Sequence, residues 1–229
     1  MKKIFLGLFV LAAMGELLSQ VMELPVLHTI TKPALLLLLL GYYFFASRER
    51  NNSISPMVVL ALLFSWGGDV LLMKTGELFF MLGLVSFLIA HVFYIFVFRQ
   101  ARNNDETSSL QGLQRIRFAF PIILYGSGLV VILYAELGDM TVPVLIYALV
   151  LTLMVLNALF RFGRTSSASF AYVFGGAILF MISDSLLAVN KFLEPISLSG
   201  FWIMLTYIGA QFLIVTGLLK DDVHNMAGK

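Results

Sequence analysis

Eight long stretches of apolar residues constrain the fold of this chain more than any other feature. A helix that crosses a bilayer needs about 20 predominantly apolar residues. Such stretches run over Ile4–Val21, Thr31–Phe45, Met57–Met73, Phe79–Phe98, Phe118–Leu137, Val142–Phe160, Phe170–Ala188 and Phe201–Leu219, of which the second is the shortest. Each run is continuously apolar rather than alternating, which indicates helices rather than barrel strands. The sequence therefore predicts an all-α integral membrane protein, a bundle of eight transmembrane helices.

The composition agrees with a membrane protein. Hydrophobic residues make up 60% of the 229-residue chain and charged residues only 12%, whereas soluble domains carry about 25% charged residues. A net charge of +2 gives no reason to expect a nucleic-acid partner. The absence of cysteine excludes disulfides and thiolate chemistry. The loops are short, so residues 1–229 are expected to form one transmembrane domain; homo-oligomerisation stays open.

The basic residues predict the orientation of this bundle. The first apolar run follows two lysines, but Glu16 interrupts it and no small-residue cleavage site follows, so it is read as an uncleaved span rather than a signal peptide. Eight spans place both termini on one side. That side would carry Lys2, Lys3, Arg48, Arg50, Arg99, Arg102, Arg115, Arg117, Arg161, Arg164, Lys220 and Lys229, against Lys32, Lys74 and Lys191 on the other. The positive-inside rule therefore predicts cytoplasmic termini, in a bacterial inner membrane.

A few polar residues fall within the apolar spans, where ionisable groups are costly and usually functional. Asp69 and Asp184 each precede the outer end of their predicted span by four residues, so both should lie about 6 Å below that boundary. Lys32 begins the second span on the same side, and Glu16 lies in the outer half of the first. His91 and Gln211 lie deeper, with Tyr94 and Tyr207 nearby on their helices. We expect one polar cavity open to the non-cytoplasmic side.

Each of these residues also has a structural interpretation. A single buried Asp can simply bond a neighbouring helix, but two at matching depth favour a functional pair. Glu16 is left open between a functional group and a side chain that snorkels to the surface. The other two histidines, His28 and His224, are expected in a loop and a tail, so a three-histidine zinc site and other metal sites are not expected.

Five short motifs occur in order along nearly the whole chain. They are Thr31-Lys32-Pro33; Phe64-Ser65-Trp66-Gly67-Gly68-Asp69; Gly83, Phe87, His91 and Tyr94; Gly176-Ala177-Ile178-Leu179-Phe180 leading into Ser183-Asp184; and Tyr207 with Gln211. Together they resemble the YhhN family, the lysoplasmalogenase-type membrane proteins. The resemblance implies a hydrolase of lysoplasmalogens, which are lysophospholipids with a vinyl-ether chain. It implies release of a fatty aldehyde and a glycerophospho-ethanolamine or -choline, with no metal or organic cofactor.

The chemistry of a vinyl ether independently suits two carboxyl groups. Hydrolysis protonates the β-carbon and leaves an oxocarbenium ion that water attacks, so it needs a general acid, a group that activates water, and negative charge. We expect Asp69 and Asp184 to form this catalytic pair, with roles unassigned. Lys32 would hold the lipid phosphate or tune Asp69. The expected supporting residues, which would orient water and substrate, are His91, Tyr94, Ser183, Tyr207 and Gln211.

Two other functions stay open from the residues alone. A small-molecule or proton-coupled transporter also uses buried Asp, Lys and His, but it predicts repeated halves and broken helices. A scaffold without catalysis predicts that replacing Asp69 affects only stability. The family resemblance, rather than the residues by themselves, favours the enzyme.

Overall fold

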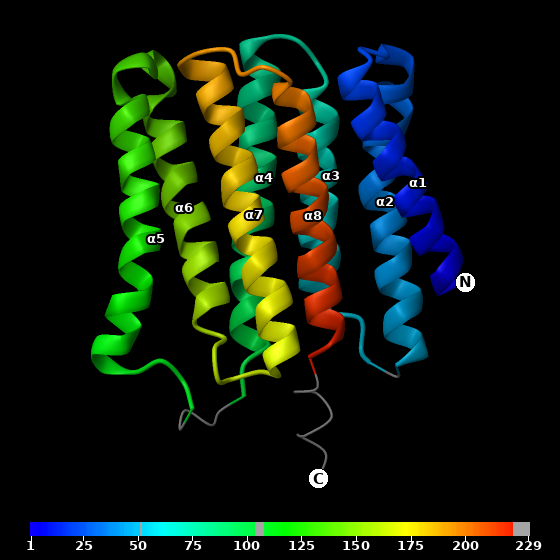
Figure 1. The fold of residues 1–229 in the computed structure, drawn as a ribbon, viewed down its shortest axis with the longest axis vertical. Helices are drawn as coiled ribbons and strands as arrows, with labels where there is room; N and C mark the ends of the chain where they lie inside the picture. Colours follow the sequence, from blue (N-terminus) through cyan, green and yellow to red (C-terminus); the bar gives the residue numbers. More distant parts are fainter. Residues whose placement is uncertain (51, 104–107, 222–229) are drawn as a thin grey trace.

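The structure is a computed structural model that describes residues 1–50, 52–103 and 108–221. Within these residues it contains eight α-helices, two single 3-10 turns and no β-strand, which confirms the predicted all-α bundle. The helices are α1 (Lys2–Val21), α2 (Pro25–Glu49), α3 (Pro56–Leu72), α4 (Glu77–Gln100), α5 (Gly112–Leu133), α6 (Thr141–Leu159), α7 (Ser167–Phe192) and α8 (Ser199–Leu219). The turns η1 (Tyr134–Glu136) and η2 (Gly138–Met140) join α5 to α6. Consecutive helices run in opposite directions (Figure 1).

Among the described helices, seven are long and apolar enough to cross a membrane. The remaining one, α3, has 17 residues, or about 26 Å of helix against a hydrocarbon core of about 30 Å. The prediction that the second span is the shortest is wrong, because α2 has 25 residues. Pro25 is well suited to the first turn of a helix, and polar residues extend α2 at both ends. Similarly, α5 begins at Gly112, so Arg115 and Arg117 lie in a helix rather than in the expected loop.

The bundle is built from antiparallel pairs. Helices α1 and α2, α3 and α4, and α7 and α8 pack most extensively, while α6 contacts α4 and α8 contacts both α1 and α2. A glycine permits the close approach of α7 and α8. A Cβ atom at Gly176 would lie 2.8 Å from the carbonyl oxygen of Ala210, so the backbones of α7 and α8 can touch only because this position has no side chain.

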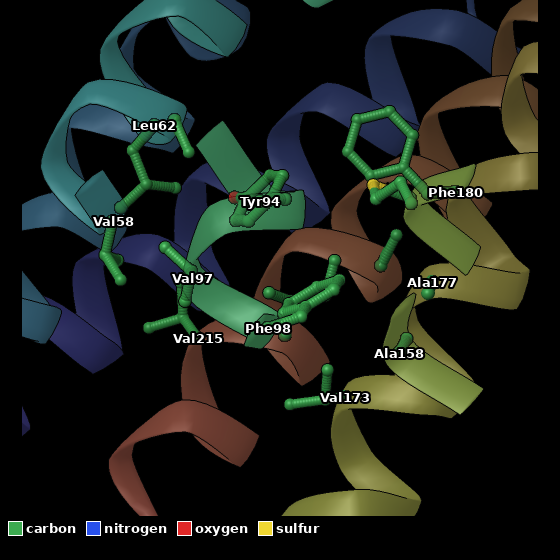
Figure 2. Close-up of a cluster of buried hydrophobic side chains, with 14 of the residues drawn as sticks. Val58, Leu62, Tyr94, Val97, Phe98, Ala158, Val173, Ala177, Phe180 and Val215 are labelled. Atoms are coloured by element: carbon green, nitrogen blue, oxygen red, sulfur yellow. The ribbon is translucent and has the colours of Figure 1, made fainter. Parts of the chain in front are cut away.

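Helix α4 contributes two large aromatic side chains to the packed interior. Its side chains Tyr94 and Phe98 are fully buried, and Figure 2 shows them between Leu62 of α3, Val215 of α8 and Phe180 of α7. Because lipid tails are as apolar as leucine, burial of such residues does not by itself drive helix association in a membrane. Close packing and polar contacts between helices must contribute instead.

The helices α1, α3, α5 and α7 all finish at one end of the bundle, the upper end in Figure 1, which we call the cavity end. Helix α1 begins and α8 finishes at the opposite end. Cytoplasmic termini would place the cavity end on the outer side of the membrane, and this orientation stays a prediction.

Candidate active site

A cavity of about 300 Å³ lies at the cavity end and is lined mainly by α7 and α8, with further residues from α1, α2, α3 and α4. Five of the residues expected at the site line it: Lys32, Asp69, Ser183, Asp184 and Tyr207. The two carboxyl groups, distant in sequence, thus face one cavity. Asp69 lies close to the end of α3, which finishes at Leu72. Asp184 lies farther from the end of its helix, because α7 continues to Phe192, beyond the expected end at Ala188.

Asp69 is almost fully buried and stands at the end of a chain of hydrogen bonds. The Tyr207 hydroxyl donates to Oδ2 of Asp69 over 2.7 Å. The Gln211 side-chain amide donates to the same hydroxyl over 3.5 Å, and the Tyr94 hydroxyl donates to Oε1 of Gln211 over 2.5 Å. This chain crosses from α4 through α8 to α3, so it fixes the Asp69 carboxyl and binds three helices together.

Asp184 is held by a different tyrosine. The Tyr147 hydroxyl of α6 donates to Oδ2 of Asp184 over 2.5 Å. His91 Nε2 lies 3.8 Å from the same oxygen, which is beyond hydrogen-bond distance. His91 is fully buried, with its ring edge-on to Tyr147 and Phe180. Neither of its ring nitrogens has a hydrogen-bond partner among the described residues.

The predicted supporting residues therefore fall into two groups. Tyr207, Ser183 and Lys32 line the cavity, whereas His91, Tyr94 and Gln211 lie in the interior behind it. Ser183 donates to the carbonyl of Ile203 over 3.1 Å, which joins α7 to α8. Lys32 lies beside a second link, since the Trp66 indole of α3 donates to the carbonyl of Pro33 over 3.0 Å.

Glu16 anchors the wall of the cavity formed by α1 and α2. Its carboxylate accepts from Gln20, Thr31 and His28 at 2.8, 2.7 and 2.8 Å, and it has no exposed surface, so the snorkelling interpretation is wrong. The expectation that His28 lies in a loop is also wrong, because α2 begins at Pro25. His28 and Gln20 both line the cavity. The other histidine outside the spans, His224, lies outside the described residues.

Two members of this site, His28 and Tyr147, were not predicted from the sequence. His28 precedes Lys32 by four residues, which places both on one helix face, but the predicted span began too late to include it. Tyr147 offered only a weaker signal, a single hydroxyl within an otherwise apolar span.

Comparison with known proteins identifies the family. The sequence model of the YhhN family matches residues 27–218. The chain belongs to the YhhN family. The match includes α2 to α8 almost entirely, and with them Asp69, Asp184 and both of their tyrosine partners.

Several curated relatives resemble this YhhN protein over much of its length. Lysoplasmalogenase TMEM86B of Homo sapiens is 31% identical over 71% of this chain and 63% of its own. Lysoplasmalogenase TMEM86A of Homo sapiens is 30% identical over 72% of this chain and 65% of its own. A lysoplasmalogenase of Mycobacterium tuberculosis is 29% identical over 70% and 59%. The matched region thus spans about three fifths of these relatives. No solved structure matches the chain.

Proposed function

We propose that this YhhN protein is a membrane-embedded hydrolase of the vinyl ether bond of lysoplasmalogens. It would release a fatty aldehyde and a glycerophospho-ethanolamine or -choline. The observation that carries the proposal is the placement of Asp69 and Asp184, from two helices, on one cavity within the bundle. The relatives named lysoplasmalogenase supply the bond on which such a pair would act.

The geometry supports this chemistry in two respects. Each carboxyl accepts a hydrogen bond from a neutral tyrosine, which leaves its second oxygen available to exchange a proton with substrate or water. The same cavity is lined by Lys32 and Lys191, whose ammonium groups suit the phosphate of a lysophospholipid. A single-chain lipid could therefore present its headgroup to the lysines and its ether bond to the carboxyls.

The continuity of the helices favours this proposal over the alternative of a small-molecule or proton-coupled transporter. Transporters of several families bind their substrate at interrupted helices near the middle of the bilayer. Here α3 and α7, which carry the two carboxyls, run without interruption over Pro56–Leu72 and Ser167–Phe192. The site is at one end of these helices rather than at a break within them.

The decisive experiment measures aldehyde release by the purified protein in detergent. Lysoplasmenylethanolamine is compared with two lysolipids of equal chain length, one with a saturated ether and one with an ester. We expect aldehyde from the vinyl ether and no reaction of the other two. Equal hydrolysis of the ester would contradict the proposal. It would also be contradicted if none of the three lipids reacted and proteoliposomes with the protein took up a labelled lysolipid.

A further inference from the structure

A second, narrow pocket adjoins the cavity and differs from it in chemistry. It has a volume of about 40 Å³ and lies among α4, α6 and α7, with Leu72 of α3 at its edge. Its wall is apolar except at Asp184 and Tyr147: the apolar lining residues are Leu72, Phe80, Leu84, Phe87, Val144, Leu187, Ala188 and Phe192. We call this pocket the apolar groove. It has no lysine or histidine in its lining, in contrast to the cavity.

The two carboxyl groups differ in which of the two spaces they line. Asp184 lines both the cavity and the apolar groove, whereas Asp69 lines the cavity alone. Phe87 also lines both and separates the interior of the bundle from them, with its ring edge-on to Phe180 and Tyr207. Asp184 therefore stands at the junction between a polar space and an apolar one, and Asp69 stands on the polar side.

A lysoplasmalogen changes from polar to apolar at its ether bond, as the two spaces do at Asp184. Its headgroup, glycerol and ether oxygen are polar, and the chain beyond the vinyl carbons is apolar. An apolar cavity that holds benzene measures about 150 Å³, so the apolar groove has room only for the carbons next to the ether. The β-carbon of the vinyl ether is the second carbon from the ether oxygen, at the chain end of the double bond, and it would then lie beside Asp184.

We infer that the apolar groove binds the first carbons of the alkenyl chain, that Asp184 is the acid that protonates the β-carbon, and that Asp69 is the base that activates water. This assignment rests on the proposed function and deepens it. Each carboxyl accepts a hydrogen bond from a tyrosine hydroxyl, so the assignment rests on position: Asp184 lines the apolar groove as well as the cavity, and Asp69 lines the polar cavity alone.

With these roles the reaction balances, and it needs no reagent other than water. Asp184 gives its proton to the β-carbon, the C=C π electrons form the new C–H bond, and an oxocarbenium ion results. Water adds to the carbon that bears oxygen and passes a proton to Asp69, which gives a neutral hemiacetal. The hemiacetal hydroxyl returns a proton to Asp184 while the bond to the glycerol oxygen breaks, and that oxygen takes the proton of Asp69. Aldehyde and alcohol leave, and both carboxyls regain their starting states.

The groove is tested by filling it. Val144→Phe occupies it, and Val142→Phe places the same ring two residues away on the lipid-facing side of α6, where Val142 is 64% exposed. With a hexadecenyl substrate and with a propenyl substrate alike, we expect kcat/KM to fall about tenfold or more for Val144→Phe, because both chains have the first carbons that the groove would hold. The Val142→Phe control should change by less than about twofold on either substrate. Ala188→Phe fills the same groove from α7 and is the second variant if Val144→Phe does not fold. A loss on the long chain alone, or no loss, overturns the assignment of the groove.

The roles of the two carboxyls are tested in heavy water. A variant that keeps the acid but lacks the base can protonate the vinyl ether and lose a proton again, so recovered substrate gains deuterium at the β-carbon. We expect this exchange with Asp69→Asn and none with Asp184→Asn. Exchange with Asp184→Asn, or with neither variant, overturns the assignment. Failure of the function is distinct, because wild-type protein would then release no aldehyde in ordinary water.

Discussion

The two ends of the bundle both bury ionisable groups, but the groups have different bonding partners at the two ends. At the end opposite the cavity, Arg161 is fully buried and donates to Asp221 over 2.8 Å and to Ser169 over 2.9 Å. Ser169 in turn donates to the carbonyl of Gly217. A guanidinium, a carboxylate, a hydroxyl and a carbonyl thereby join the ends of α6, α7 and α8.

At the cavity end, by contrast, Asp69 and Asp184 are bonded by neutral tyrosine hydroxyls and face a space large enough for a ligand. A buried ion pair whose charges neutralise each other contributes to the assembly of the helices and leaves little capacity for chemistry. A buried acid bonded by a neutral donor keeps its ability to give or take a proton. The difference predicts that substitutions at one end affect stability and that substitutions at the other affect turnover.

The largest effect is expected from Asp69→Asn, which keeps the size of the side chain but cannot exchange a proton. Aldehyde release should fall by about a thousandfold, within the range for loss of a general acid or base. The melting temperature in detergent should change little. Asp184→Asn should behave alike. Asp139→Asn alters an exposed carboxyl at the same end and serves as the control. If Asp69→Asn released aldehyde at close to the wild-type rate, the proposed carboxylate mechanism would be wrong.

Arg161→Met tests the other half of the comparison. Removing one partner of a buried ion pair leaves the Asp221 carboxylate without its guanidinium, and such changes cost about 3–5 kcal/mol of stability. We expect a large drop in melting temperature with nearly unchanged kcat for the molecules that remain folded. Arg117→Met, at an exposed position of α5, is the matched control. A stable Arg161→Met protein that has lost activity would reverse the roles given to the two ends.

Intermediate effects are expected from the tyrosines. Tyr207→Phe and Tyr147→Phe each remove one hydrogen bond to a carboxyl of the proposed catalytic pair, a contribution of about 1.5–3 kcal/mol. Because about 1.4 kcal/mol corresponds to tenfold, kcat should fall about 10- to 100-fold in each case. Tyr125→Phe, on the exposed face of α5, controls for the substitution. Unchanged kcat in both variants would show that the tyrosines only join helices.

The smallest effect is expected from Lys32→Met, and its form matters more than its size. If Lys32 holds the lipid phosphate, KM should rise about tenfold with kcat nearly constant, since an interaction made equally in ground and transition states affects binding alone. A fall in kcat at constant KM would indicate that Lys32 tunes Asp69 instead. Lys74→Met removes an exposed lysine at the same end and should leave both parameters unchanged.

The helices could be predicted from sequence because hydropathy measures what the bilayer requires of each span. The rotation of each helix about its axis could not, since lipid-facing and buried residues are equally apolar. Phe120 is 59% exposed and Phe180 fully buried, although both lie within predicted apolar spans. Asp69 and Asp184 could be grouped because ionisable residues escape this ambiguity. Tyr147 could not, because a tyrosine is tolerated on either face of a helix.

Helix α1 contributes to the candidate site although it lies outside the family match. The family match begins at residue 27, after α1 has ended. Nevertheless Glu16 of α1 bonds Thr31, next to Lys32, and Gln20 forms part of the cavity wall. The matched part of the chain thus does not complete the cavity by itself. A substitution in α1 would therefore alter the polar surface that a headgroup meets, while α3 and α7, which carry the two carboxyls, lie wholly within the match.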